Sequence, residues 1–532
     1  MNKKLTGFEK LEAQIKEKES HIILGLDPTE EMDKEIERFM PTPMDSYYKN
    51  LSYEERYLVG LEGYLKWLID ETAEHIVGIK PNMAFYESSA ERKAVMQRVV
   101  EHAQSKNLIT ILDVKRGDIM DTQSEWAKAD ITNFNPDIVT LNAYMGGADV
   151  IQPYLDLDDS LCAYILVATS NPGARKFQDQ VSGGIHNYQQ MALLGRECDS
   201  NRVGFVIGST RPDAMKNVRS LELEYGYGDN LGHVLAPGFG KQGGNLEFVS
   251  LSGPNAVYPI SSGLTKEQNL GGRTPKEAAR DWRDEINTRI NDNNMKSITE
   301  TVVDNMVNED LIWVPKKPEI WTWQLLKKGK NKLTDNNISM SGMDIEEKTA
   351  LLKKALEDGV LDSSDFGAIF LQLRDVIGTT ETRRLLAHLY TKLINESGVD
   401  FDRVGSIAYG AINTGDLVSL FLDKPAFLLR KERGQETTHS DILGYLNEND
   451  RAIMIEDVTT SADSLVKDVN MLRSATGAKI TDAFVFVKRT PEGETNCLEN
   501  GIKLHYVMDM DKLKIYLGKS EAITPEVKGM IL

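Results

Sequence analysis

The stretch Ile111-Leu-Asp-Val-Lys-Arg-Gly-Asp-Ile-Met-Asp-Thr122 begins as an apolar run and ends in charged residues. In an extended strand, residues two apart face the same side, so we expect Asp113 and Lys115 to project together. Gly117 allows a sharp exit, and Asp118 falls just beyond the strand. A lysine held between carboxylates at a strand end is electrostatically costly unless its charge is used. The pattern therefore predicts a strand that carries charged groups into a site, with a surface ion pair as the plain alternative.

Similar apolar, β-branched runs recur through the first half of the chain, separated by stretches with helical periodicity such as residues 90–106 and 124–133. The eight runs are Ile22–Leu26, Ile76–Ile79, Ile109–Val114, Ile138–Leu141, Ala163–Ala168, Val203–Ile207, His233–Leu235 and Ala256–Ile260. Continuous apolar strands that alternate with helices indicate a parallel sheet buried on both faces. Eight such units in roughly 250 residues predict a (β/α)8 TIM barrel, with an open doubly wound sheet as the alternative.

Each of these runs ends in polar, charged or glycine-bearing residues. The exits are Gly25-Leu-Asp27, Lys80-Pro-Asn82, Asp113-Val-Lys115, Asn142-Ala-Tyr144, Thr169-Ser-Asn171, Gly208-Ser-Thr-Arg211, Pro237-Gly-Phe-Gly-Lys-Gln242 and Ser261-Ser-Gly263. Barrel enzymes carry their chemistry at the C-terminal ends of the strands, so the exits are the candidate site.

The composition limits the classes of partner. A chain of 532 residues exceeds what one hydrophobic core supports, so two or more domains are expected. A net charge of −19 argues against nucleic acid or an anionic membrane as the main partner. Three cysteines without metal-ligand spacing, no apolar signal region and no run long enough to span a bilayer predict a cytoplasmic protein.

The exit motifs carry a resemblance over roughly Phe8 to Ile290. In chain order they are Gly-Leu-Asp27-Pro, Lys80-Pro-Asn-Met-Ala-Phe-Tyr-Glu, Asp113-x-Lys115-x-x-Asp118-Ile-x-x-Thr122, Thr-Ser170-Asn-Pro-Gly and Pro-Gly-x-Gly-x-Gln242-Gly-Gly. This half resembles the orotidine 5'-phosphate decarboxylase family. A metal-dependent sugar-phosphate lyase or synthase shares the Asp-x-Lys-x-x-Asp element and is a competing reading, which Ser170-Asn-Pro-Gly and Gln242 oppose.

The resemblance implies loss of carbon dioxide from orotidine 5'-phosphate, with no cofactor or metal. It assigns catalysis to Lys80, Asp113, Lys115 and Asp118, and implies a homodimer because Asp118 acts in the neighbouring subunit's site. It assigns substrate binding to Asp27, Thr122, Ser170, Gln242 and Gly263. Asp27 would contact the ribose, Ser170 would read the pyrimidine, and Gln242 would link base to phosphate.

The phosphate end departs from the family pattern. Family members carry an arginine beside the last phosphate-binding glycine, whereas this chain reads Ile260-Ser-Ser-Gly-Leu264. Backbone amides around Gly263 could still bind phosphate. Arg273 or Lys266 would then supply the charge.

The residue composition changes after the barrel pattern. We therefore predict three parts: a barrel over residues 1–295, a linker over 296–343 and a second α/β domain over 344–532. The linker carries lysine clusters and a polar stretch typical of a solvated connection. In the last part, helical patterns over 346–357 and 380–395 precede expected strands at 403–408, 426–429, 452–455 and 481–487.

The key segment of the second domain is Ala452-Ile-Met-Ile-Glu456-Asp457-Val-Thr-Thr460-Ser461-Ala-Asp-Ser464. An apolar strand ends in two acids, which can grip vicinal hydroxyls, and small hydroxyl residues then lead into a helix whose N-terminus can hold phosphate. This resembles the signature of type I phosphoribosyltransferases. Leu429-Arg430-Lys431-Glu432, residues 408–415 and Gln372-Leu-Arg374 are similar to orotate phosphoribosyltransferase in particular.

That resemblance implies synthesis of orotidine 5'-phosphate from orotate and phosphoribosyl pyrophosphate with Mg²⁺. The binding residues it implies are Arg430, Lys431, Glu456, Asp457, Thr460, Ser461 and Ser464. The expected mobile loop departs from the family, because Gly434 stands at the lysine position; Arg433 or His439 could substitute, and Ala462 replaces a glycine.

Together the two halves predict a bifunctional enzyme of pyrimidine synthesis that acts on small molecules and assembles as a homodimer or higher homo-oligomer. The alternative keeps the decarboxylase and makes the C-terminal half a non-catalytic nucleotide-binding or oligomerisation module. The altered loop around Gly434 favours this alternative, and the intact Glu456-Asp457 pair opposes it.

Overall fold

The fold is described from a computed structural model of the chain. It describes residues 4–42, 48–228, 230–239, 246–290, 296–309, 312–313, 370–371, 379–407, 411–429 and 442–521, with isolated positions between 333 and 360 and after 521. The chain forms two compact units. The first comprises residues 1–181 and 186–297, and the second comprises residues 182–185 and 298–532.

The first unit is a closed barrel of parallel strands in the order β1-β10-β9-β8-β5-β4-β3-β2. Its strands are β1 (Ile22–Leu26), β2 (Gly78–Pro81), β3 (Ile109–Arg116), β4 (Ile138–Leu141), β5 (Cys162–Ala168), β8 (Val203–Ile207), β9 (Val234–Leu235) and β10 (Ala256–Ile260). Closure between β1 and β10 confirms the predicted barrel and excludes the open sheet, because the strands have no free edge.

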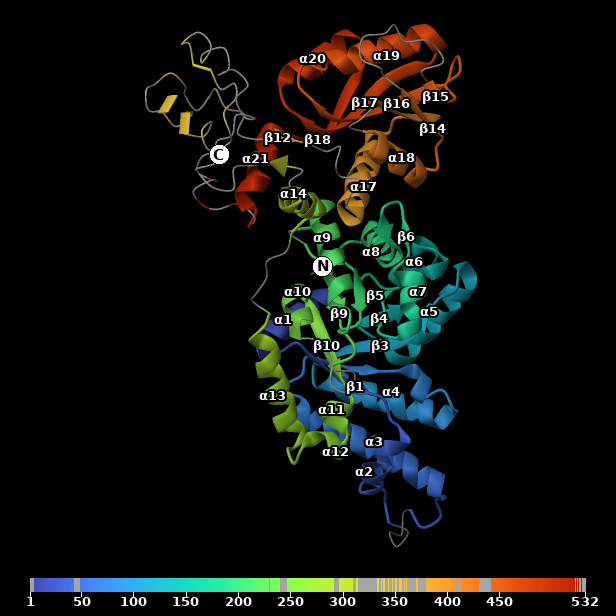
Figure 1. The fold of residues 1–532 in the computed structure, drawn as a ribbon. Helices are drawn as coiled ribbons and strands as arrows, with labels where there is room; N and C mark the ends of the chain where they lie inside the picture. Colours follow the sequence, from blue (N-terminus) through green and yellow to red (C-terminus); the bar gives the residue numbers. More distant parts are fainter. Residues whose placement is uncertain are drawn as a thin grey trace. The chain divides into compact units, whose positions relative to one another are not determined.

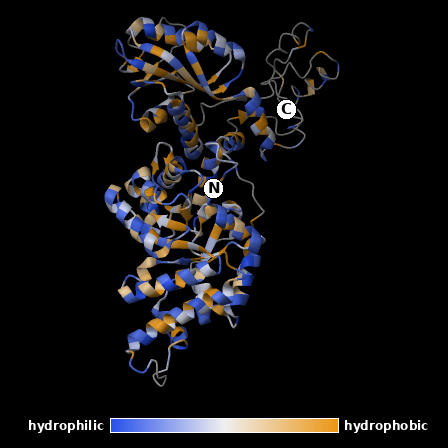
Figure 2. Ribbon diagram, turned by 180° about the vertical axis from the view of Figure 1, so that it is seen from behind, coloured by the Kyte–Doolittle hydropathy of each residue, from blue (hydrophilic) through white to orange (hydrophobic). Residues whose placement is uncertain are grey.

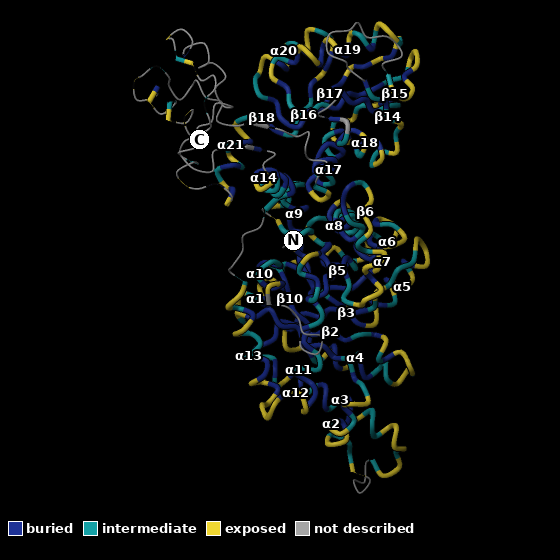
Figure 3. Tube along the Cα trace, in the orientation of Figure 1, coloured by how far each residue is buried: buried dark blue, intermediate teal, exposed yellow. Residues whose placement is uncertain are grey.

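Burial on two sides explains why the strands read as continuous apolar runs. Ile22 and Leu24 of β1 belong to a core that also holds Leu65 of a surrounding helix, whereas Ile23 between them belongs to the inner cluster. Alternate residues of one strand thus face the helices and the barrel interior. Figure 3 shows most of the barrel strands buried, while the last three residues of β3 are partly or fully exposed.

Helices surround the barrel strands (Figure 1). They are α1 (Gly7–Lys18), α2 (Asp33–Glu37), α3 (Tyr53–Thr72), α4 (Ala90–Ser105), α5 (Met120–Phe134), α6 (Gly147–Leu155), α7 (Arg175–Gln178), α8 (Asn187–Cys198), α9 (Pro212–Glu224), α10 (Leu246–Ser252), α11 (Ser262–Thr265), α12 (Glu267–Leu270) and α13 (Pro275–Asn287). Between α7 and α8 lies a short two-stranded sheet, β6 (Val181–Ser182) and β7 (Ile185–His186). Four short 3-10 helices span Glu30–Met32, Met83–Phe85, Ala143–Met145 and Pro172–Ala174.

Helix α1 packs on the inner cluster of the barrel. Thr6 and Glu9 form a reciprocal capping box at its start. Phe8 and Leu11 then join the inner cluster, and Phe8 stacks on the His233 ring with centroids 4.1 Å apart. Because the chemistry of a barrel lies at the opposite ends of the strands, this helix serves stability.

The second unit contains a six-stranded sheet in the order β15-β14-β13-β16-β17-β18, parallel except for the edge strand β15. Its strands are β13 (Arg403–Ile407), β14 (Ala426–Leu429), β15 (Ile442–Gly444), β16 (Arg451–Thr459), β17 (Lys479–Lys488) and β18 (Lys503–Asp509). Figure 2 shows apolar residues running along these strands. The predicted second α/β domain is confirmed in its α/β architecture.

Helices cover both faces of this sheet (Figure 1). They are α17 (Thr380–Ser397), α18 (Ile412–Phe421), α19 (Asp463–Thr476), α20 (Pro491–Glu499) and α21 (Met510–Lys519). A further helix, α14 (Ile298–Asn308), packs on α17 and α21, and β11 (Ile312–Trp313) and β12 (Phe370–Leu371) form a small antiparallel pair. Helix α14 lies within the stretch predicted as a linker, and it buries Val302, Val303 and Met306 as part of the second unit. Among the described residues, no helix is long and apolar enough to cross a membrane.

Candidate active sites

Strand β3 does not end as a regular strand. Its pairing with β4 shifts between Leu112, which lies opposite Val139, and Arg116, which lies opposite Leu141. Within this bulge Lys115 has φ 48°, a left-handed conformation that non-glycine residues adopt rarely. Gly117 is not at positive φ; a Cβ there would lie 2.7 Å from the Asn142 carbonyl oxygen, so its role is close approach to the neighbouring exit. The sharp turn predicted at Gly117 is therefore made at Lys115.

Asp113 binds two lysines at once. Its Oδ2 lies 2.6 Å from Lys80 Nζ and its Oδ1 lies 2.5 Å from Lys115 Nζ. Thr140 Oγ1 donates a third hydrogen bond to Oδ1 at 2.9 Å. Burial opposes the charge of Asp113, but the two ammonium groups outweigh burial and hold the pKa of this carboxyl well below its usual range. Asp113 is thus an ionised, fixed anion.

Lys80 lies on β2, paired with Gly25 of β1, and is buried. Burial lowers its pKa, but the carboxylates of Asp113 and Asp27 more than offset burial, so the pKa of Lys80 is raised and the lysine stays charged. Asp27 follows β1, and its Oδ1 is buried without a hydrogen-bond partner among the described residues. An unpartnered carboxylate oxygen beside this network is open to a ligand hydroxyl.

The structure separates Asp118 from this network. The described residues contain no ion pair of Asp118 with Lys115; instead its Oδ1 accepts the Ile119 backbone N–H at 2.8 Å. Gln123 accepts the Asp118 backbone N–H, so the backbone here is held in place. Thr122, on the first turn of α5, is exposed. Of the four predicted catalytic residues, three meet within one subunit and Asp118 does not.

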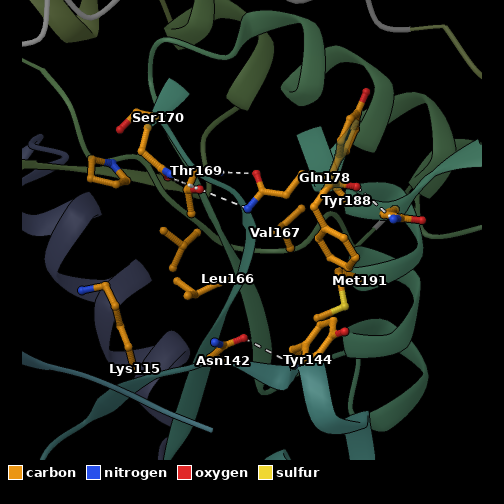
Figure 4. A pocket seen from close by; sticks show the side chains of 15 residues that line it. Lys115, Asn142, Tyr144, Leu166, Val167, Thr169, Ser170, Gln178, Tyr188 and Met191 are labelled. Atoms are coloured by element: carbon orange, nitrogen blue, oxygen red, sulfur yellow. Dashed lines mark hydrogen bonds between the residues drawn. The ribbon is translucent and has the colours of Figure 1, made fainter. Parts of the chain in front are cut away.

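A cavity of about 710 Å³ opens beside Lys115 at the ends of β4, β5 and β8. Lys115 and Ser170 both line it, together with apolar side chains such as Leu166 and Met191 (Figure 4). Gln178 fixes one wall: its Oε1 accepts the Thr169 backbone N–H at 2.9 Å, and its Nε2 donates to Thr169 Oγ1 at 3.0 Å. The cavity thus combines a cation, hydroxyls and an apolar surface, as expected for a flat heterocycle.

The residues predicted to bind the substrate phosphate form a less complete site. Gly263 lies in the first turn of α11. Lys266 forms an ion pair with Glu31, and Arg273 donates to the Leu270 carbonyl oxygen and to Asp281, so the structure engages both candidate cations elsewhere. Gln242 lies outside the described residues.

In the second unit, Glu456 and Asp457 lie near the end of β16 and are partly buried. Burial and the adjacent charge of Asp457 raise the pKa of Glu456 well above its usual value. Tyr390 donates to the Glu456 carbonyl oxygen at 2.7 Å and fixes the backbone. Arg489, at the end of β17, lies close enough for the charge of Asp457 to raise its pKa, although burial is the larger effect and lowers it.

The loop after these acids has a strained point. Ala462 caps α19 with φ 61°, the left-handed conformation that glycine adopts without cost. Ser461 Oγ donates to Asp463 at 2.6 Å, and Asn496 donates to the Ser461 carbonyl oxygen, while Thr460 and Ser464 are exposed. Arg430 and Lys431 lie outside the described residues, as do residues 372–374, 408–410 and 433–439.

Sequence reasoning missed three contributors to these sites. Thr140 lies inside an apolar strand and belongs to no recognisable motif. The signal that could have identified it is a polar residue within a run that is buried on both faces. Gln178 is the last residue of the short helix α7, in a stretch with several polar residues, so nothing singled it out. Arg489 directly follows a strand, as Asp27 does, and this position was the signal that the sequence offered.

With this geometry established, comparisons identify the class. Residues 20–247 match the Orotidine 5'-phosphate decarboxylase / HUMPS family. The orotidine 5'-phosphate decarboxylase of Roseiflexus castenholzii is 34% identical over 53% of this chain and 98% of its own. The chain therefore belongs to the orotidine 5'-phosphate decarboxylase family, which confirms the resemblance inferred from the strand exits.

Particular relatives extend the similarity to the second unit. The bifunctional enzyme PyrF/PyrE of Nostoc sp. is 23% identical over 98% of this chain and 98% of its own. Among solved structures, Leishmania donovani UMP synthase has a TM-score of 0.44 and 22% identity, and the match covers 99% of this chain and 98% of that one. The match to the Nostoc enzyme spans both units of this chain, which the predicted fusion of two activities requires.

The buried charge network gives a stability prediction. Asp113→Asn leaves the Lys80 ammonium, whose side chain is 8% exposed, without its main counter-charge, so we expect the barrel to lose about 3 kcal/mol of unfolding free energy. The double variant Asp113→Asn/Lys80→Met should recover part of this loss. Urea unfolding of the full chain measures both.

The loss of unfolding free energy in Asp113→Asn should depend on pH. The Asp113 pKa is depressed on folding, so its contribution is full above the ordinary carboxyl pKa of about 4 and declines as pH falls below it. The gap between wild type and Asp113→Asn should therefore narrow in acid. Equal stability of the two proteins at neutral pH would contradict the assignment.

The strained cap gives a second prediction. Ala462→Val places a β-branched residue at positive φ and should cost the second unit about 2 kcal/mol. Ala462→Gly should change stability by less than about 1 kcal/mol, because relief of strain offsets the loss of a buried methyl group. Thermal unfolding of the two variants beside wild type tests this, and a valine variant as stable as the glycine variant refutes it.

Proposed function

We propose that the barrel decarboxylates orotidine 5'-phosphate to UMP. The observation that supports this most directly is the Lys80–Asp113–Lys115 network at the C-terminal end of the barrel, beside a cavity lined by Ser170. Such a network fixes two positive charges and one negative charge before the substrate arrives. Preorganised charge accelerates a reaction when charge changes during it.

The proposed step breaks the bond between C6 of the pyrimidine and its carboxylate carbon. Carbon dioxide leaves, and the electron pair stays on C6, where the Lys115 ammonium stabilises it and then supplies the proton. Asp113 forms an ion pair with Lys115 and would crowd the departing carboxylate. Asp27 would accept a ribose hydroxyl, Ser170 would read the base, and Thr122, Gln242 and Gly263 would bind the remainder of the nucleotide. We propose that this half needs no cofactor.

We further propose that the site is completed by a second copy of the chain. Asp118 makes no ion pair with the lysines of its own subunit among the described residues, and exposed apolar residues follow it directly in the chain. Ile119 is 46% exposed and Met120 is 62% exposed, with Tyr144 and Met145 also exposed after β4. An apolar rim of this kind is typical of a subunit contact, which would bring Asp118 to the partner's Lys115.

We propose that the second unit makes orotidine 5'-phosphate from orotate and phosphoribosyl pyrophosphate. Glu456 and Asp457 offer adjacent carboxylates at a strand end, and Thr460, Ser461 and Ser464 lead into the N-terminal turn of α19. Mg²⁺ binds one or two carboxylates together with substrate phosphates, and this donor set fits that requirement. The ion would neutralise the pyrophosphate, while Glu456 and Asp457 hold the ribose hydroxyls and Arg430 and Lys431 bind phosphate.

An assay on the purified full chain tests both halves. Orotate, phosphoribosyl pyrophosphate and Mg²⁺ are supplied in one reaction, and orotidine 5'-phosphate with a chelator in another, and UMP is followed. We expect product in both. Product from orotidine 5'-phosphate alone would favour a decarboxylase with a non-catalytic C-terminal module, and product in neither would refute the decarboxylase.

Co-expression of two inactive variants tests the shared site. Lys115→Ala and Asp118→Asn should each be nearly inactive, yet a mixed dimer contains one intact site, so random mixing should restore about a quarter of wild-type decarboxylation. Co-expression of Lys115→Ala with Lys80→Ala is the matched control, because both residues belong to the same subunit's half and no site is restored. Recovery in the control, or none in the test pair, would contradict the proposal.

A further inference from the structure

The bulge in β3 leaves three residues opposite one. Between the pairs Leu112–Val139 and Arg116–Leu141, the β3 residues 113–115 face the single β4 residue Thr140. The regular ladder cannot supply hydrogen bonds to this stretch. Thr140 itself is 1% exposed, so its side chain lies buried beside this stretch.

The Thr140 hydroxyl supplies hydrogen bonds to this stretch, both as an acceptor and as a donor. It accepts the Lys115 backbone N–H at 3.0 Å and donates to Asp113 Oδ1 at 2.9 Å. A backbone N–H can only donate, so the single hydroxyl proton points to Asp113, whose Oδ1 is the acceptor. One side chain thus binds the backbone of the lysine and the carboxylate that the same lysine contacts.

This bond has a geometric consequence. The left-handed backbone of Lys115 is unfavourable by itself and persists only where the surroundings hold it. Thr140 provides the only described side-chain partner of the Lys115 backbone N–H, and it holds Asp113 at the other end. The path of the lysine side chain toward the cavity therefore starts from a point that Thr140 fixes.

We propose that Thr140 is a positioning residue for decarboxylation, which sets the placement of the Lys115 ammonium relative to Asp113 and the substrate carbon. The inference rests on the proposed function of the barrel. Thr140 touches no substrate atom in this account; it acts through Lys115 and Asp113. Its loss should therefore lower kcat and leave substrate binding largely unchanged, since Asp27 and Ser170 are held by other strands.

The test replaces Thr140 with residues of similar size. Thr140→Val removes the hydroxyl and should lower kcat by about 10- to 100-fold, because a displacement near 1 Å costs this much, with KM within about threefold of wild type. Thr140→Ser keeps the hydroxyl and should recover most of the lost kcat. The matched control is Thr110→Val on β3, because Thr110 Oγ1 is buried with no partner among the described residues and its loss should leave kcat unchanged.

Two kinetic results would overturn the proposal: a valine variant with kcat within about threefold of wild type, or a serine variant as impaired as valine. Thermal unfolding verifies that each variant is folded; if valine is not, Thr140→Cys replaces it, since a thiol is a weak donor and acceptor.

Crystal structures of wild type and Thr140→Val separate this inference from the function on which it rests. We expect Lys115 to leave its left-handed conformation in the valine variant. A Lys115 that keeps both this conformation and its contact with Asp113 would overturn the inference, whether or not the protein decarboxylates. An inactive wild type with a displaced Lys115 in the variant would instead refute the proposed reaction and leave the positioning role standing.

Discussion

The barrel site depends on one carboxylate held between two ammonium groups. Asp113 is buried, and a buried anion is stable only when its partners compensate for lost hydration. Lys80 on β2, Lys115 at the end of β3 and Thr140 on β4 supply that compensation from three neighbouring strands. The positions of these strands relative to one another, and therefore closure of the barrel, determine whether the charges meet.

Much of this fold can be predicted from the sequence, because strands that are buried on both faces appear as continuous apolar runs. The strands at Ile22–Leu26, Ile138–Leu141, Val203–Ile207 and Ala256–Ile260 coincide with their apolar runs, since a polar residue or a glycine follows each run. Strand β2 begins two residues later than expected, at Gly78 rather than Ile76, although the Val77 backbone already exchanges hydrogen bonds with Ile22 of β1 and Ile109 of β3.

The site was less predictable than the fold because it departs from regular geometry. The alternation of side chains along a strand predicts that Asp113 and Lys115 lie close together, and they do form an ion pair. They meet, however, through a bulge and a left-handed residue that no pattern of residue types reveals. The role of Thr140 follows only from that bulge. Ala462 shows the opposite case: a glycine expected from family resemblance is absent, yet the backbone keeps the conformation that glycine would favour.

The two units hold their carboxylates under opposite electrostatic conditions. Asp113 contacts the ammonium groups of two lysines, so its negative charge is compensated within the protein itself. Glu456 and Asp457 place two carboxyl groups side by side, and burial together with mutual repulsion raises the pKa of Glu456. A hydroxyl-rich ligand or a cation relieves that repulsion by supplying donors or positive charge. In the proposed functions, the barrel site acts on charge that develops on its substrate during the reaction, whereas the second site accepts charge from the ligands that bind there.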